Sequence, residues 1–287
     1  MKPSAKYADL PGDHGGGAVR MTTLPCPTES VELNYFNEDC MVGMSRYPDK
    51  AFDLAIVDPP YFSGPERRRY YGRSQSKTGV FRSYNPSVQR WCVPQEDYFN
   101  ELERVCRHYI VWGCNYFDHK FPEGRIVWDK CNGRSTFSDA EIAATTLFKS
   151  VRLFPFMWNG MMQGKSISDG RTQQGNKTLN EIRIHPTQKP VALYEWILKT
   201  FAKPGWKILD THVGSGSSLI ACHKLGLSAT GFEIDPIYYA SSCERIKRYA
   251  RLQSDAEQQV HIHQICLDEC LRPHDSQSQS QKKGEHT

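Results

Sequence analysis

The chain has 287 residues, of which 39% are hydrophobic and 24% charged, and its formal net charge is +4. A chain of this length buries enough apolar surface to fold without disulfides or structural metals. It contains no run of about 18 apolar residues and no apolar signal-peptide core, so we expect a cytoplasmic protein with no membrane partner. Its ten cysteines are scattered through apolar surroundings. We expect them to be reduced and mostly buried.

The first thirty residues are rich in Gly, Pro and Thr and have no hydrophobic periodicity, which predicts a flexible leader at 1–30. From residue 31 short apolar runs alternate with amphipathic segments. The elements predicted in chain order are strands at 31–36 and 52–57, a helix at 95–107, strands at 109–112, 126–128 and 142–148, a helix at 190–201, a strand at 206–209, a helix at 217–225, a strand at 228–232 and a helix at 236–252.

This alternation predicts an α/β fold with a mostly parallel sheet covered on both faces. Two residues predict the start of the last helix, because Asp235 is a capping residue and Pro236 suits the first helical position. Two β-rich runs around Lys149 and Ser150 predict one antiparallel hairpin over 141–156 at a sheet edge. From residue 255 the chain turns polar, which predicts a disordered tail at 255–287.

A cluster of His and Cys lies within this tail. Its members are His261, His263, Cys266, Cys270 and His274. Their spacing matches none of the usual zinc-ligand pairs, so we interpret them as a frayed helix end and expect no metal.

A basic segment follows the second predicted strand. Between positions 62 and 90 it carries Arg67, Arg68, Arg69, Arg73, Lys77, Arg82 and Arg90 against the single acid Glu66, with Tyr70, Tyr71, Phe81 and Tyr84 interleaved. Basic side chains neutralise phosphates and aromatic faces stack on bases. Taken alone, however, the pattern favours a solvated surface loop.

The segment 206–235 is typical of a nucleotide-type cofactor site. A short strand ends at Asp210, and a turn containing Gly214 and Gly216 leads into a helix. The following strand ends at Glu233, where a carboxylate accepts hydrogen bonds from ribose hydroxyls. Leu219 replaces the third glycine of the dinucleotide pattern. Asp210 repels a diphosphate but attracts an ammonium, so the segment favours S-adenosylmethionine over NAD.

The tetrapeptide Asp58-Pro59-Pro60-Tyr61 directly follows the strand at 52–57. Its prolines fix the backbone, so that the Asp58 carboxylate and the Pro59 carbonyl present two acceptors together. An exocyclic amino group is a poor nucleophile because its lone pair is conjugated with the base. Two acceptors on its hydrogens expose that lone pair to a methyl donor, and Tyr61 stacks on an extruded base. Taken alone, a strand-ending turn explains the tetrapeptide equally well.

Three motifs in order carry a family resemblance: Asp58-Pro-Pro-Tyr61, His185-Pro-Thr-Gln-Lys-Pro190 and Leu209-Asp-Thr-His-Val-Gly-Ser-Gly216. Together they resemble the DNA amino-methyltransferases of adenine N6 and cytosine N4. The catalytic motif precedes the cofactor motif, as in the circularly permuted β-class. The resemblance covers most of the chain, from about residue 31 to 248, and implies a Rossmann-like methyltransferase fold with S-adenosylmethionine as its cofactor.

The resemblance also implies roles for individual residues. The catalytic group would be Asp58, Pro59, Pro60 and Tyr61. Asp39 would accept from the cofactor's adenine amino group, and Glu233 would hold the ribose. His185, Thr187 and Lys189 would lie near the methionine carboxylate, with Asp58 near the same end of the cofactor. Asp210, His212, Gly214 and Gly216 would form the cofactor loop, although Thr211 and His212 stand where the family usually has an aromatic and a small residue.

The resemblance gives the basic segment a function, because a loop that leaves the catalytic tetrapeptide lies at the active-site mouth. Insertions near 62–93 and 157–184 are therefore the predicted DNA-recognition segments of a catalytic domain at 31–254. Arg67, Arg68, Arg69, Arg73, Lys77 and Arg82 are the predicted DNA-binding residues. Two polar clusters, at 128–130 and 138–141, are interpreted as structural ion pairs.

The sequence thus predicts a site-specific adenine-N6 methyltransferase acting on double-stranded DNA. Aspartate at position 58 favours adenine, since cytosine-N4 relatives more often carry serine there. Two alternatives stay open: a cytosine-N4 methyltransferase, and a catalytically inactive DNA-binding protein on the same fold. Whether the chain acts as a monomer or a homodimer is open as well.

Overall fold

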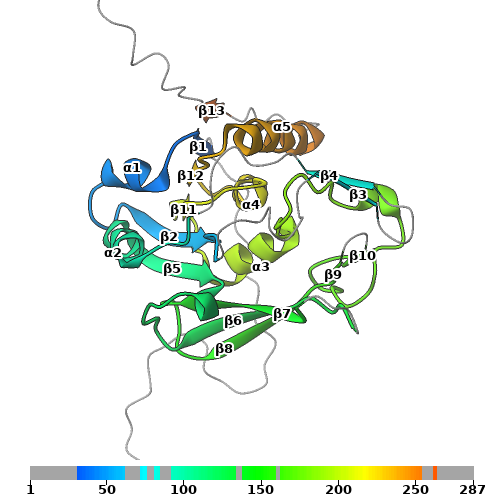
Figure 1. The fold of residues 1–287 in the computed structure, drawn as a ribbon, viewed down its shortest axis with the longest axis horizontal. Helices are drawn as coiled ribbons and strands as arrows, with labels where there is room; N and C mark the ends of the chain where they lie inside the picture. Colours follow the sequence, from blue (N-terminus) through cyan, green and yellow to red (C-terminus); the bar gives the residue numbers. More distant parts are fainter. Residues whose placement is uncertain are drawn as a thin grey trace, which may run out of the picture.

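The computed structural model describes residues 31–61, 72–75, 81–84, 92–133, 138–159, 162–253 and 261–263. Its main feature is a nine-stranded sheet flanked by helices (Figure 1). The sheet contains β1 (Glu32–Phe36), β2 (Phe52–Val57), β5 (Cys106–Trp112), β6 (Gly124–Asp129), β7 (Ala140–Thr145), β8 (Val151–Pro155), β11 (Ile208–Asp210), β12 (Ala229–Phe232) and β13 (His261–His263). The helices are α1 (Cys40–Ser45), α2 (Glu96–Val105), α3 (Val191–Phe201), α4 (Ser217–Lys224) and α5 (Pro236–Gln253).

The strands lie in the order β13-β1-β12-β11-β2-β5-β7-β6-β8. Every pairing from β13 to β5 is parallel, β7 is antiparallel to both of its neighbours, and β6 pairs with β8 in parallel. β2 and β11 are adjacent, so the loops that follow them begin side by side at the carboxyl edge of the sheet. The predicted α/β fold with a mostly parallel, Rossmann-like sheet is confirmed.

Alternate side chains of the strands enter two separate cores, one on each face of the sheet. Leu54 and Ile56 of β2 pack in the core that contains α3, α4 and α5. Ala55 and Val57 of the same strand pack in the core that contains α1 and α2. Burial on both faces explains why β2 is an almost uninterrupted apolar run.

Two aspartates begin helices at this edge of the sheet. Asp235 Oδ1 accepts hydrogen bonds from the backbone N–H groups of Ile237 (2.9 Å) and Tyr238 (3.3 Å), so the predicted cap of α5 is confirmed. Asp39 caps α1 in the same way, accepting from Met41 N at 2.7 Å. The sequence analysis did not predict α1, which is only six residues long.

The predicted hairpin over 141–156 is wrong in its pairing. β7 and β8 are not neighbours, because β6 lies between them and pairs with both. The hairpin partner of β7 is therefore the preceding strand. Burial explains the order: β7 contributes the buried Ala143, Ala144 and Thr145 inside the sheet, whereas β8 exposes Val151 and Leu153 at its edge.

Part of the predicted tail is also corrected. Residues 261–263 form β13, which pairs in parallel with β1 and extends the sheet, so this piece is neither disordered nor a helix end. The other three residues of the His and Cys cluster lie outside the described residues.

Two small antiparallel sheets occupy the predicted recognition segments. β3 (Gly72–Gln75) pairs with β4 (Phe81–Tyr84), which places the backbones of Arg73 and Arg82 in adjacent strands. β9 (Trp158–Asn159) pairs with β10 (Met162–Gln163), and a 3-10 turn, η3, spans Lys177–Leu179. The predicted DNA-binding residues Arg67, Arg68, Arg69 and Lys77 lie outside the described residues.

Among the described residues, Cys40, Cys106, Cys114, Cys131 and Cys222 carry free thiols. Cys106, Cys114, Cys222 and Cys243 are buried, whereas Cys92 is exposed. Among the described helices, none combines the length and apolar character needed to cross a bilayer.

Candidate active site

A cavity of about 370 Å³ opens at the carboxyl edge of the sheet. Its walls come from the residues that follow four parallel strands, β1, β2, β11 and β12, together with residues from the segment 185–189. An α/β sheet binds its ligands at this position, where the strand connections diverge. The structure thus brings the predicted catalytic tetrapeptide and most of the predicted cofactor residues around one cavity.

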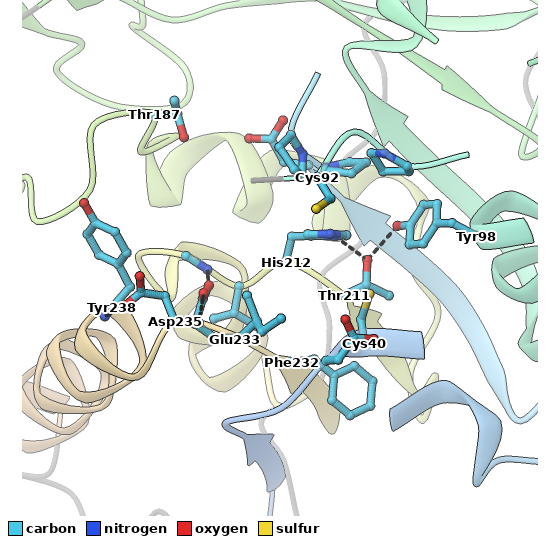
Figure 2. Close-up of a pocket in the computed structure, with 18 of the residues that line it drawn as sticks. Cys40, Cys92, Tyr98, Thr187, Thr211, His212, Phe232, Glu233, Asp235 and Tyr238 are labelled. Carbon is cyan, nitrogen blue, oxygen red and sulfur yellow. Dashed lines mark hydrogen bonds between the residues drawn. The ribbon is translucent and has the colours of Figure 1, made fainter. Parts of the chain in front are cut away.

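Glu233, which is labelled in Figure 2, and Gly214 both line the cavity. The Gly214 N–H donates to Glu233 Oε2 at 2.8 Å, and the Asp235 N–H donates to Glu233 Oε1 at 2.9 Å. Gly214 has a φ of +54°, a conformation that L side chains rarely adopt. Burial raises the pKa of Glu233 to about 7. Each oxygen of Glu233 retains a lone pair for a ribose hydroxyl.

Asp210 and Gly216 shape the loop from outside the cavity. Neither is among the described residues that line it. The Asp210 carboxylate accepts from the His212 N–H at 3.0 Å and from the Ser218 hydroxyl. Gly216 begins α4 with a φ of +79°. Asp210 and Gly216 therefore fix the geometry of the turn, and their predicted part in the cofactor loop stays a prediction.

His212 lies within the cavity wall, as predicted. Its Nδ1 hydrogen-bonds the Thr211 hydroxyl at 2.9 Å, and that hydroxyl also hydrogen-bonds Tyr98 at 2.7 Å (Figure 2). Its ring meets the Tyr98 ring edge-on at 5.5 Å. Burial lowers the pKa of His212 to about 4, so the ring is neutral at pH 7. A neutral ring offers a flat apolar face where the family usually has an aromatic or small side chain.

His185 and Thr187 also line the cavity. The Thr187 N–H and hydroxyl lie 3.3 and 3.1 Å from His185 Nδ1. Since a backbone N–H only donates, Nδ1 is the acceptor and the imidazole proton sits on Nε2. Burial lowers the pKa of His185 to about 3, which keeps this ring neutral too. The ring covers Gly214, where it would lie 3.8 Å from an added Cβ atom.

Asp39 lines the cavity after β1, next to Glu38. One Asp39 oxygen caps α1, and Glu38 forms an ion pair with Arg46. This arrangement is compatible with the role that the resemblance implies for Asp39.

Lys189 lines the cavity, and its predicted place near the methionine carboxylate stays a prediction. Its ammonium forms an ion pair with Asp58 Oδ2 and lies 3.0 Å from Glu141 Oε2, with the Trp112 ring 5.6 Å away. Its side chain is only 3% exposed. Burial alone would lower the pKa of Lys189, but the Asp58 and Glu141 carboxylates raise it well above its ordinary value. Lys189 is thus a partner of Asp58, and its charge is already matched within the protein.

Asp58 leaves one acceptor unused. Its Oδ2 contacts Lys189, whereas its buried Oδ1 accepts no hydrogen bond from the described residues. Buried carboxylate oxygens are normally satisfied, so an orphaned one on a residue that lines the cavity marks a place for a ligand donor. Beside it the Tyr61 ring stacks on Tyr116, with centroids 4.6 Å apart and planes 12° apart.

The predicted ion pairs of the two polar clusters are confirmed by a contact of 2.5 Å between Lys130 Nζ and Glu141 Oε1. Sequence reasoning did not find that Glu141 also reaches the site through Lys189. It missed Tyr98 and Tyr116 as well, because their contacts join residues far apart in the chain. No local pattern reports such contacts.

Comparison with known proteins identifies the family. A family model described as DNA methylase matches residues 127–244. Type II methyltransferase M.HpaI of Haemophilus parainfluenzae is 40% identical over 233 residues, which cover 71% of each chain. The chain belongs to the DNA methylases.

Two further proteins are similar to most of this chain. The putative methylase YubD of Escherichia coli (strain K12) is 24% identical over 225 residues, covering 76% of this chain and 91% of the relative. The structure of the cytosine-N4-specific PvuII DNA methyltransferase covers 84% of this chain and 99% of its own, with 14% identity and a TM-score of 0.45.

Membership confirms the predicted amino-methyltransferase family and its cofactor, S-adenosylmethionine. The described residues fit that cofactor. Glu233 presents carboxylate lone pairs for ribose hydroxyls, His212 presents a neutral ring for the adenine, and Asp58 Oδ1 is a buried acceptor beside them.

Proposed function

We propose that this methylase transfers a methyl group from S-adenosylmethionine to the N6 amino group of an adenine extruded from double-stranded DNA, at a specific site. The observation that carries the proposal is the orphaned Asp58 Oδ1, which is buried at the cavity next to a stacked tyrosine pair. A carboxylate oxygen there needs an N–H or O–H donor, and the target amino group is such a donor.

The acceptors of the tetrapeptide activate the amino group. Asp58 Oδ1 takes one of its two hydrogens and the Pro59 carbonyl takes the other, so the nitrogen lone pair turns toward the methyl donor. Bound S-adenosylmethionine would supply the methyl group, and its sulfonium would leave as a neutral thioether when the C–N bond forms. The methylated nitrogen loses one proton to the acceptor or to water. The protein contributes alignment and acceptor geometry.

The aromatic pair provides a platform for the extruded base. Tyr61 and Tyr116 stack parallel to each other, and a purine stacks on such a surface. Stacking offsets the cost of about a few kcal/mol for removing a base from the duplex.

The cofactor residues are proposed in the places that the geometry supports. Glu233 holds the ribose, His212 and Asp39 contact the adenine, and His185 and Thr187 line the methionine end. Asp210 and Gly216 support this loop from behind. The basic segment near 62–93 and the segment 157–184 are proposed to hold the DNA.

Adenine is favoured over cytosine by Asp58 itself, because cytosine-N4 relatives more often have serine at this position. A carboxylate is the stronger hydrogen-bond acceptor. Cytosine N4 presents the same kind of amino group, so the product decides between the two bases.

Asp58→Asn tests the proposal, since the amide keeps the shape of the side chain and removes the charge. We expect the rate of methyl transfer to duplex DNA to fall by at least about 10²-fold, because charged acceptors stabilise the developing charge on nitrogen. Methyl-labelled S-adenosylmethionine reports turnover, and calorimetry reports cofactor binding, which should persist.

Glu244→Gln is the matched control, because Glu244 lies on α5 with a side chain that is 76% exposed. This variant should methylate DNA at the wild-type rate. Undiminished turnover by Asp58→Asn would rule out the proposed mechanism.

A further inference from the structure

Glu141 connects the catalytic aspartate to a strand outside all three sequence motifs. It lies on β7, the one described strand of the sheet that runs antiparallel to its neighbours. Its Oε1 contacts Lys130 Nζ at 2.5 Å, and its Oε2 contacts Lys189 Nζ at 3.0 Å. It does not belong to the described lining of the cavity, so it acts on the site only through these partners.

Lys189 is the centre of this network. An ammonium that is 3% exposed is costly to bury unless carboxylates surround it. Asp58 and Glu141 contact it from two sides, and Glu141 is itself held by Lys130. The four side chains carry two positive and two negative charges, which balance. Without Glu141, Lys189 would have Asp58 as its one remaining carboxylate partner among these residues.

We propose that Glu141 is a positioning residue for methyl transfer: by holding Lys189 from one side, it restricts the ammonium to Asp58 Oδ2 and keeps Oδ1 available for the target amino group. The inference rests on the proposed function. It assigns Lys189 and Glu141 to the orientation of Asp58, at the base end of the site.

The charges around Asp58 determine how the network is tested. Lys189 and Lys130 are positive, Glu141 and Asp210 are negative, and Tyr61 adds a phenol. Burial raises the pKa of Asp58, Lys189 lowers it, and Glu141 raises it again. Removing the charge of Glu141 therefore lowers the pKa of Asp58, and the partial recovery of rate in Glu141→Asp separates positioning from a purely structural role.

Glu141→Gln removes the charge with little change in shape, and Glu141→Asp keeps the charge on a shorter side chain. We expect single-turnover methyl transfer at saturating cofactor to fall by about 10- to 100-fold in Glu141→Gln, since small misplacements of a catalytic group have effects of this size. Glu141→Asp should recover part of the rate. Both variants should bind S-adenosylmethionine with the wild-type Kd, which also shows that they are folded, and Glu244→Gln should match the wild type.

Carbon-13 NMR of labelled aspartate carboxyl groups gives a second readout that needs no activity. The Asp58 resonance is assigned by its loss in Asp58→Asn, and its pKa should be lower in Glu141→Gln than in the wild type. The acid limb of the pH–rate profile should move to lower pH in the same variant.

The two readouts separate this inference from the proposed function. An unchanged rate or an unchanged pKa of Asp58 in Glu141→Gln would overturn the positioning role. A wild-type protein that methylates no DNA would contradict the proposed function, while the NMR titration would still decide whether Glu141 controls Asp58.

Discussion

Glu233 is a buried carboxylate that we propose to hold the cofactor's ribose, so its ionisation should affect cofactor binding. Burial raises its pKa to about 7. Ribose hydroxyls donate hydrogen bonds to carboxylate lone pairs, and the ionised carboxylate accepts them better than the protonated acid does. Cofactor binding therefore favours the ionised carboxylate and lowers its pKa. His185 and His212, with pKa values of about 3 and 4, stay neutral over the same range.

The sign of the pH dependence follows. Below pH 7 binding has to displace a proton from Glu233, so affinity for S-adenosylmethionine falls as pH falls. We expect the Kd for S-adenosylmethionine to be about tenfold higher at pH 6 than at pH 8. Calorimetry in buffers of different ionisation enthalpy would detect proton release at pH 6. Glu233→Gln should bind more weakly and lose this pH dependence; a wild-type Kd that is constant over the range would contradict the assignment.

At the scale of single residues, the sequence predicted the site residues that belong to one of the three motifs or to the segment 206–235. Asp58, Tyr61, His212 and Glu233 all line the cavity as expected. The sequence did not predict that Lys189 pairs with Asp58 and Glu141, because these contacts join residues far apart in the chain.

The turn after β5 supports the catalytic tetrapeptide. Gly113 has a φ of +68° and leads into η2 (Cys114–Tyr116). A Cβ atom on Gly113 would lie 2.4 Å from Cδ1 of Tyr61. The absence of a side chain at Gly113 therefore allows the Tyr61 ring to lie beside this turn.

Gly113→Ala should displace Tyr61, and Gly205→Ala is its control. Gly205 also has a positive φ, +77°, but an added Cβ would meet nothing within 4 Å. Both substitutions should cost about 1 kcal/mol of stability because of backbone strain. Only Gly113→Ala should lower kcat/KM for DNA, by roughly tenfold, since base stacking is weakened. Thermal unfolding and steady-state kinetics measure the two effects; equal kinetics in both variants would show that Tyr61 does not need this gap.

At the scale of elements, hydrophobic periodicity predicted most strands and helices within a few residues. β2 matches its predicted range, and α5 begins at the predicted cap. Strand pairing was less accessible. Whether β7 pairs with β6 or with β8 depends on which strand is buried on both faces of the sheet. A local stretch of sequence does not show which strand lies between two others in the folded sheet. The short helix α1 was missed because six residues give too little periodicity.

At the scale of the whole molecule, the tetrapeptide that follows β2 and the loop that follows β11 lie at the same edge of one sheet. β2 and β11 lie side by side although about 150 residues separate them in the chain, so the catalytic tetrapeptide and the cofactor loop meet. The motif order predicted this meeting only through the family resemblance. The separate observation that supports it is the shared cavity.

The central claim, adenine-N6 methylation at a specific DNA site, is tested most directly by sequencing the DNA of an expression host with detection of modified bases. The wild-type chain and Asp58→Ala are expressed in parallel. We predict N6-methyladenine confined to one short sequence motif in cells that express the wild type, and none at that motif with the variant. N4-methylcytosine at the motif would contradict the choice of base, and DNA without any new modification would contradict the claim of methyl transfer.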